Sequence, residues 1–108
     1  MNWIPLTTLQ ELDNLITSST LKPALIFKHS TRCGISRMAL KNFERSFNFS
    51  EDEISAYYLD LLNFRDISKA IADKLYVFHQ SPQLIVLKNG EVIHHSSHGD
   101  IDVENIKL

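Results

Sequence analysis

The chemistry in this sequence centres on its only cysteine, Cys33. Cys33 follows a polar turn, residues 29–32, which separates a continuously apolar run from a segment with helical periodicity. A thiol at the first turn of a helix lies beside unpaired backbone N–H groups and the positive end of the helix dipole. Both favour the thiolate, which is the nucleophile. Arg32 and His29 are expected to add positive charge nearby, so we predict a reactive thiol in preference to a buried, inert one.

Ser36 lies three residues after Cys33, where a Cys-x-x-Cys redox pair has its second cysteine. One helical turn is expected to bring its hydroxyl close to the sulfur, where it can donate a hydrogen bond to the thiolate. Capping of the helix start is the alternative role. Ser36 cannot resolve a disulfide, so any mixed disulfide on Cys33 has to be opened by another molecule.

Ser81 and Pro82 directly precede a second apolar run. Proline lacks a backbone donor and is normally kept out of central strands, so it marks the start of this one. A cis bond here would leave the backbone of Ser81 available to pair with an extended substrate. A plain trans turn is the alternative, and the local sequence leaves both open.

Three histidines close to one another, His94, His95 and His98, invite comparison with a metal site. On a strand, His94 and His95 face opposite sides and cannot chelate one ion together. His94 and His98 could share a face, but a third ligand is not evident. We therefore predict no metal site.

Local patterns predict the elements that position these groups. The first half is expected to hold a short edge strand at Trp3 and Ile4 that ends at Pro5, a helix capped by Thr7 or Thr8 with Glu11 completing a capping box, and a buried strand over residues 24–27. A second helix is expected to begin near Cys33 and to carry on one side Ile35, Met38, Ala39, Phe43 and Phe47.

The second half is expected to hold a central strand within residues 52–62 and a helix capped by Asp66 that runs through Leu75. A hairpin follows, with strands at residues 84–87 and 92–93 joined by Asn89-Gly90, a pair that accepts the positive φ of a type I′ turn. A short terminal helix is expected from Asp102.

This order, β-α-β-α-β-α-β-β-α, predicts an α/β protein with a thioredoxin-like fold. The first two central strands are joined through a helix, so they should pair in parallel, whereas the hairpin adds an antiparallel edge. We expect a central mixed sheet with helices on both faces, formed by a single domain over residues 1–108.

Composition narrows the classes of function. Hydrophobic residues make up 44% of the chain and charged residues 22%, as in soluble globular proteins. Eleven basic residues are scattered among thirteen acidic ones, so no nucleic-acid partner is expected. No apolar run approaches the ~20 residues that cross a bilayer, and no secretory signal is recognisable. One cysteine excludes an internal disulfide, and we expect a cytoplasmic protein with no membrane partner.

Residues 27–36, Phe-Lys-His-Ser-Thr-Arg-Cys-Gly-Ile-Ser, resemble the signature of the YtxJ family, the monothiol bacilliredoxins. Further matches follow in order along the chain, namely Tyr57-Tyr58-Leu59-Asp60-Leu61, Arg65-Asp66-Ile67-Ser68, His79-Gln80-Ser81-Pro82-Gln83, Lys88-Asn89-Gly90-Glu91 and Ser97-His98-Gly99-Asp100-Ile101. The resemblance spans essentially the whole chain, and the combination is specific although each piece alone is weak.

The resemblance implies a thioredoxin-like fold in which Pro82 is cis and lies beside the active cysteine, Cys33. It implies a role in bacterial bacillithiol metabolism, with bacillithiol as co-substrate, bacillithiolated proteins as partners and no tightly bound cofactor. The thiolate would attack the bacillithiol sulfur of a protein mixed disulfide and hold bacillithiol on Cys33. A second low-molecular-weight thiol or a partner's thiol would then regenerate the enzyme. Ser81 next to Pro82 would align the mixed disulfide.

Two positions depart from the family pattern, which commonly has proline after the cysteine and glutamate before the Ser-Pro pair. This chain has Gly34 and Gln80 there. Gly34 is expected to loosen the active-site turn and to alter thiol acidity or partner choice, but its presence removes no catalytic group.

A rival hypothesis comes from monothiol glutaredoxins. Residues 33–36, Cys-Gly-Ile-Ser, also resemble their Cys-Gly-Phe-Ser motif, and residues 82–84 are similar to their Pro-Gln-Leu. That resemblance implies a [2Fe–2S] carrier in which Cys33 and a bound thiol tripeptide hold a cluster between two subunits. The glycine pair that those proteins have after the last strand is missing here. Brown protein from a purification without oxygen would favour this hypothesis.

Two further alternatives remain. Residues 33–37 are similar to the Cys-Gly-Thr-Ser-Arg start of the arsenate-reductase and transcription-regulator branch, although the Ser81-Pro82 strand and the Asn89-Gly90 hairpin fit that branch less well. A non-catalytic interaction module is the other, and full activity of Cys33→Ser in cells would support it.

Overall fold

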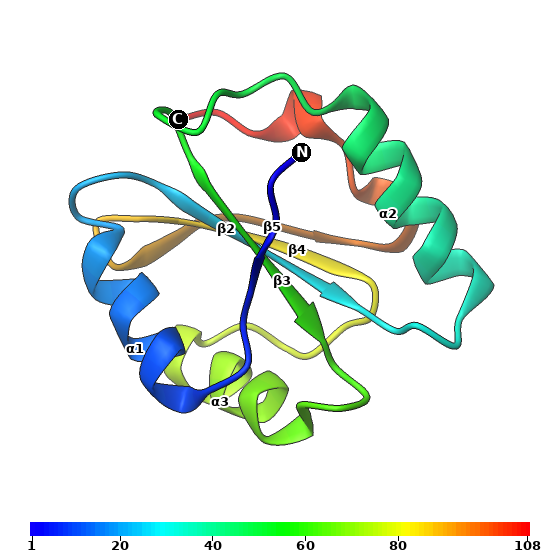
Figure 1. Cartoon of the computed structure of the whole chain (residues 1–108), viewed down its shortest axis with the longest axis horizontal. Coiled ribbons are helices and arrows are strands. Elements are labelled where there is room, and N and C mark those ends of the chain that lie inside the picture. The colour runs from blue at the N-terminus through cyan, green and yellow to red at the C-terminus, as the bar shows by residue number, and fades with distance from the viewer.

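A mixed sheet of five strands forms the centre of the computed structural model, which describes residues 1–108 (Figure 1). Its strands are β1 (Ile4–Pro5), β2 (Ala24–His29), β3 (Ser55–Asp60), β4 (Gln83–Lys88) and β5 (Glu91–Ser97), in the order β1-β3-β2-β4-β5. β3 pairs in parallel with both β1 and β2, whereas β4 is antiparallel to β2 and β5 to β4. The predicted parallel pairing and the antiparallel edge are both confirmed.

Three helices and two short 3₁₀ turns complete the chain. The helices are α1 (Leu9–Ser18), α2 (Gly34–Ser46) and α3 (Arg65–Leu75), and the turns are η1 (His98–Asp100) and η2 (Val103–Asn105). α1 and α3 lie on one face of the sheet and α2 on the other (Figure 1). Helices on both faces are what a thioredoxin-like fold requires. None of the helices is long and apolar enough to span a membrane.

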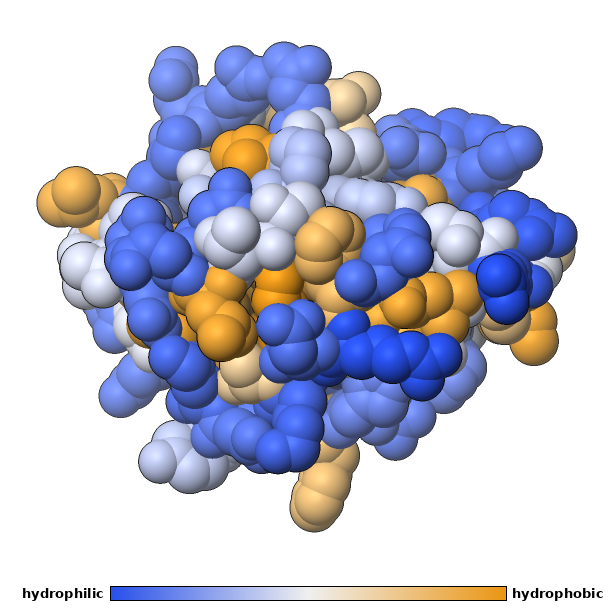
Figure 2. Space-filling view, turned by 60° about the horizontal axis from the view of Figure 1, so that its bottom comes forward, coloured by the Kyte–Doolittle hydropathy of each residue, from blue (hydrophilic) through white to orange (hydrophobic).

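Each face of the sheet has its own hydrophobic core, because the side chains of β2 and β4 alternate between the two faces. Ile26 and Ile85 pack toward α1 and α3, whereas Phe27 packs with Phe43 of α2. Every residue of β2 is buried, as expected for a central strand covered on both faces. Outside the cores, the face that carries α1 and α3 shows scattered apolar patches separated by hydrophilic side chains (Figure 2).

The first helix begins as predicted. The Thr8 side chain accepts a hydrogen bond from the backbone N–H of Glu11, and the Glu11 carboxylate accepts one from the backbone N–H of Thr8. This reciprocal capping box satisfies donors that the first turn of a helix leaves free.

Three details of the predicted elements differ from the structure. Asp66 lies in the first turn of α3, and Phe64 is the residue that precedes the helix. The expected terminal helix is only the turn η2, in which the Asp102 side chain accepts from the backbone N–H of Glu104. Ile35 and Met38 are also not part of the apolar face of α2, since 64% and 67% of their surfaces are exposed. Its apolar side is formed instead by Ala39, Leu40 and Phe43, with Phe47 directly after the helix.

Candidate active site

Cys33 lies at the strand-to-helix turn, as the residue that precedes α2. Its backbone is extended, with φ −104° and ψ 122°, and its side chain is partly exposed. The Cys33 N–H donates to the Ser30 carbonyl at 3.1 Å, and the Cys33 carbonyl accepts the first bond of the helix, from Arg37 N–H at 3.0 Å. The N–H groups between them, at residues 34–36, have no backbone partner and are available to a thiolate or a bound disulfide.

Ser36 makes different contacts from those expected. Its side chain is fully buried, and Oγ accepts a hydrogen bond from the backbone N–H of Ser30 at 3.0 Å. The same Oγ lies 2.7 Å from Nδ1 of His29. No hydrogen bond joins the Ser36 hydroxyl to Cys33, so the predicted direct support of the sulfur is wrong. Ser36 instead ties the start of α2 to the end of β2.

His29 is the last residue of β2 and not part of a solvated turn. Its ring is buried, with its centroid 5.7 Å from that of the Tyr58 ring. In the sheet, His29 is paired in register with Asp60 of β3. Burial lowers the pKa of His29, and the carboxylate of Asp60 partly opposes this effect. The ring is therefore neutral at pH 7, and the positive charge expected from His29 is absent there.

A basic group that the sequence prediction missed lies over the turn. Arg37 Nη1 donates to the carbonyl of Thr31 at 3.2 Å, and Nη2 lies 3.7 Å from the point where a Cβ on Gly34 would be. Arg32 extends into solvent without a hydrogen-bond partner. Arg37 follows Cys33 by four residues, a spacing that places both on one side of the helix start. That spacing was the signal available in the sequence.

Pro82 lies at the same end of the sheet as Cys33. The Ser81-Pro82 bond is cis, and Pro82 is buried. The pairing of Lys28 with Gln83 in β2 and β4 places Pro82 beside the end of β2, from which the chain leads to Cys33. The Pro82 carbonyl also accepts from the N–H of His98 in η1, at 3.2 Å, and η1 contacts α2. Figure 1 shows the β2–α2 connection, the segment that leads into β4 and the end of β5 at the same end of the sheet.

Ser81 itself is partly exposed, and neither its N–H nor its carbonyl has a hydrogen-bond partner in the chain. An extended ligand can use both groups. The structure thus brings Cys33, Gly34, Ser81 and Pro82 to one end of the sheet, with Ser36 buried beneath the turn and Arg32 at its exposed edge.

A buried lysine supports the segment before Pro82. The Lys28 side chain is fully buried, and Nζ lies 2.7 Å from His79 Nδ1 and 3.2 Å from Gln83 Oε1. Gln83 Nε2 in turn donates to the Phe78 carbonyl at 3.0 Å. Burial lowers the pKa of Lys28 to about 8. No sequence pattern indicated this cluster, because its members are far apart along the chain.

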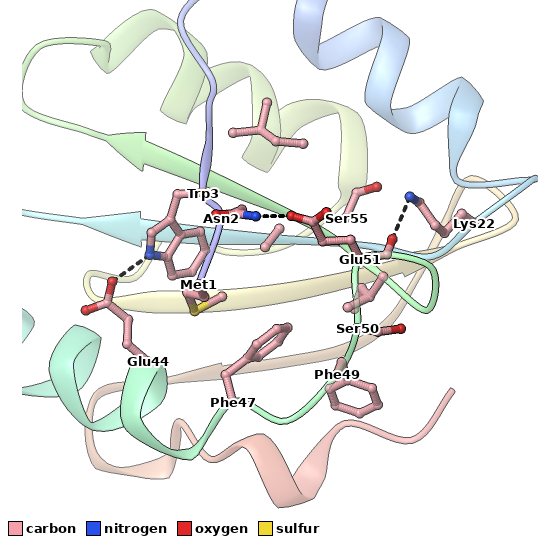
Figure 3. Close-up of a pocket in the computed structure, with 13 residues that line it drawn as sticks. Met1, Asn2, Trp3, Lys22, Glu44, Phe47, Phe49, Ser50, Glu51 and Ser55 are labelled. Atoms are coloured by element: carbon pink, nitrogen blue, oxygen red, sulfur yellow. Dashed lines mark hydrogen bonds between the residues drawn. The ribbon is translucent and has the colours of Figure 1, made fainter.

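Two hollows on the molecule lie away from Cys33. The one in Figure 3 borders the starts of the chain and of β3, at the opposite end of the sheet. There Trp3 Nε1 donates to Glu44 at 2.7 Å, and Lys22 Nζ donates to the Glu51 carbonyl at 2.7 Å. A second hollow contains His94 and no apolar side chain. No group of three or more possible metal ligands lies together anywhere in the chain.

A thioredoxin-like sheet with a single accessible thiol at a helix start defines a class, the thiol redox proteins of thioredoxin fold. Within this class, residues 4–106 match the family described as monothiol bacilliredoxin BrxC. The match covers nearly the whole chain. The protein belongs to this family, in agreement with the resemblance found in its sequence.

Solved structures agree with the thioredoxin-like fold. A protein with a thioredoxin fold, provisionally described as an oxidoreductase, is 34% identical, with a TM-score of 0.80 over 94% of this chain and 87% of that one. Thioredoxin from Malassezia sympodialis is 18% identical with a TM-score of 0.73, over 92% and 81% of the two chains. Thioredoxin from Trypanosoma brucei brucei is 13% identical with a TM-score of 0.71, over 88% and 77%. The last two show the shared fold alone.

Proposed function

We propose that this protein removes bacillithiol, or a similar low-molecular-weight thiol, from mixed disulfides on cytoplasmic proteins, with Cys33 as the nucleophile. The observation that carries the proposal is the position of Cys33. It is the one sulfhydryl of a monothiol bacilliredoxin, it is partly exposed, and it belongs to the residue that directly precedes α2, whose first N–H groups have no backbone partner. A helix start stabilises negative charge on sulfur before attack and in the transition state.

The reaction is a transfer of one thiol. The Cys33 thiolate attacks the bacillithiol sulfur of a client mixed disulfide, a new S–S bond forms, and the client sulfur leaves as a thiolate. A second small thiol then attacks the Cys33 adduct and restores the Cys33 thiolate, while both small thiols leave as their disulfide. No second cysteine exists in the chain to do this internally, so each turnover consumes an external thiol.

Groups around Cys33 fit a mixed disulfide between a small thiol and a polypeptide. The free N–H and carbonyl of Ser81 are suited to pair with an extended client backbone. Exposed Ile35 and Met38 at the start of α2 offer apolar contact to a client surface. Arg37, which covers the turn, is placed to meet carboxylates on the small thiol.

A turnover assay tests the proposal. A single-cysteine client, bacillithiolated in vitro, is incubated with the reduced protein, and free client thiol is followed with and without added bacillithiol. We expect at most one client thiol per protein without bacillithiol, and repeated turnover with it. Cys33→Ser should release no more client thiol than occurs in its absence under the same conditions. Release by Cys33→Ser at the wild-type rate would refute Cys33 as the nucleophile.

The chain offers a matched control for position. In Cys33→Ser/Ser46→Cys the one thiol moves to the exposed last residue of the same helix, at the negative end of its dipole. We expect little transfer from this variant. The same client carrying glutathione tests the identity of the small thiol, and faster release of glutathione than of bacillithiol would overturn bacillithiol as the preferred co-substrate.

A further inference from the structure

A buried pair of polar side chains, His29 and Ser36, lies directly behind the turn that carries Cys33. Oγ of Ser36 lies 2.7 Å from Nδ1 of His29 and 3.0 Å from the backbone nitrogen of Ser30. The Ser30 carbonyl also accepts the N–H of Cys33 at 3.1 Å. Any change in the Ser36 hydroxyl is therefore transmitted to the short turn of residues 30–33.

The direction of the His29–Ser36 hydrogen bond depends on the protonation of the ring. Ser30 N–H can only donate, so Ser36 Oγ accepts this bond in every state. When Nδ1 of the neutral ring is bare, the Ser36 hydroxyl donates to it. When the ring is protonated on both nitrogens, Nδ1–H donates to Ser36, and the Ser36 hydrogen has to turn toward another acceptor.

Burial disfavours the charged ring of His29, and the charged groups that face it act in both directions. On β3, Tyr58 packs on the ring and Asp60 lies opposite in register. Oδ2 of Asp60 accepts from the Asn63 side chain at 2.8 Å, whereas Oδ1 is buried and has no partner. On α2, Arg37 opposes a charge on the ring and Glu44 favours it. A buried carboxylate oxygen without a partner favours a nearby cation.

We propose that His29 is a positioning residue for Cys33 that acts through Ser36, and that protonation of the ring reverses the Ser36 hydrogen bond and stabilises the Cys33 thiolate. The released Ser36 hydrogen and the imidazolium charge both favour an anion on the adjacent turn. This inference concerns the nucleophile of the proposed function and rests on it. Its consequence is that Cys33 keeps more of its reactivity in mild acid in the wild type than in a chain that lacks the His29 imidazole.

The test is the rate of Cys33 alkylation by iodoacetamide between pH 5 and 9, a reaction that needs no bacillithiol. For each protein the rate at pH 5.5 is divided by the rate at pH 8. We expect His29→Gln to lower this ratio roughly three- to tenfold relative to wild type. Ser36→Ala should lower it likewise, and Ser36→Thr, which keeps the hydroxyl, should restore it. A purely structural role would change the rates at both pH values equally.

Two further variants keep the test decisive if His29→Gln folds poorly. Asp60→Asn removes the carboxylate that favours the charged ring. In the plot of alkylation rate against pH, the inflection on the acid side should therefore move to lower pH. His94→Gln is the matched control, because burial also lowers the pKa of His94 but this residue lies on β5 with Ser96 as its partner. Unchanged profiles in His29→Gln and Asp60→Asn would overturn the inference. If the variants show the expected changes in alkylation rate but the wild type transfers no bacillithiol, the proposed function alone is refuted.

Discussion

The side chains around Cys33 divide into those that face the thiol and those that hold its turn. Ser36 belongs to the second group, since its hydroxyl is taken by His29 and Ser30. Lys28 does the same for the segment before Pro82, through His79 and Gln83. Ser36 and Lys28 each have two hydrogen-bond partners, which gives the two sides of the site a defined geometry.

Burial of the Lys28 amine also leads to a prediction about how stability depends on pH. Its pKa is lowered to about 8 by burial, against 10.5 for an unperturbed lysine. Below pH 8 the amine is charged in both folded and unfolded chains, and the cost of burying it is fully present. Between pH 8 and 10.5 the folded chain releases the proton first, so the unfolded chain binds more protons and stability rises with pH.

We therefore expect the unfolding free energy of the wild type to gain about 2 kcal/mol over Lys28→Met between pH 7 and 10. Urea unfolding of both proteins at the two pH values measures this difference. Lys74→Met, at an exposed lysine on α3, is the control and should show no such change. A difference between wild type and Lys28→Met that stays constant with pH would contradict a titrating buried amine.

Among the elements, α2 matters most for the site, because its first residue, Gly34, directly follows Cys33. Gly34 is the first helical residue, where proline is favoured because the N–H of that position has no helical partner. Cys33 already has the extended backbone that a residue before proline adopts. A Cβ at position 34 would meet only Arg37 Nη2, at an ordinary contact distance of 3.7 Å.

Gly34→Pro is therefore expected to stabilise the protein by about 0.4–1 kcal/mol, chiefly because proline restricts the unfolded chain. Thermal unfolding followed by circular dichroism measures the effect. Gly99→Pro serves as a comparison outside the helix start. Destabilisation by Gly34→Pro would mean that the start of α2 needs the N–H or the freedom of glycine.

The sequence predicted most of the elements and less of the site, for a physical reason. Apolar periodicity located all five strands and three helices, because burial of an apolar face is a local pattern. Lys28 and His29 were left outside the predicted strand, since polar residues seldom continue a buried strand. Their partners at positions 79, 83 and 36 come from other elements, and no local pattern shows such pairing. Exposed Ile35 and Met38 matched a helical period equally well, so the buried face of α2 was drawn too wide.

For the whole molecule, the two cores share one sheet and should unfold together. Trp3 packs on Phe27 and Phe43 in the core beneath α2, and it is the only tryptophan. Ile71 is fully buried in the other core, between α3 and the sheet. A change at Ile71 should thus reach Trp3 only if the sheet couples the two faces.

Ile71→Val is expected to lower the unfolding free energy by about 0.5–1.5 kcal/mol. The urea transition should shift equally when followed by Trp3 fluorescence and by far-ultraviolet circular dichroism. A fluorescence transition that stays in place while the dichroism transition moves would show that the two faces unfold separately.

The proposed function depends most on a lone sulfur that accepts a small thiol from a client. Intact mass spectrometry of the reduced protein, mixed with a bacillithiolated client without any other thiol, measures this directly. We predict one bacillithiol adduct per chain, mapped to the peptide with Cys33, and an equal amount of free client thiol. An unmodified protein, or an adduct formed as readily on Cys33→Ser, would contradict the account.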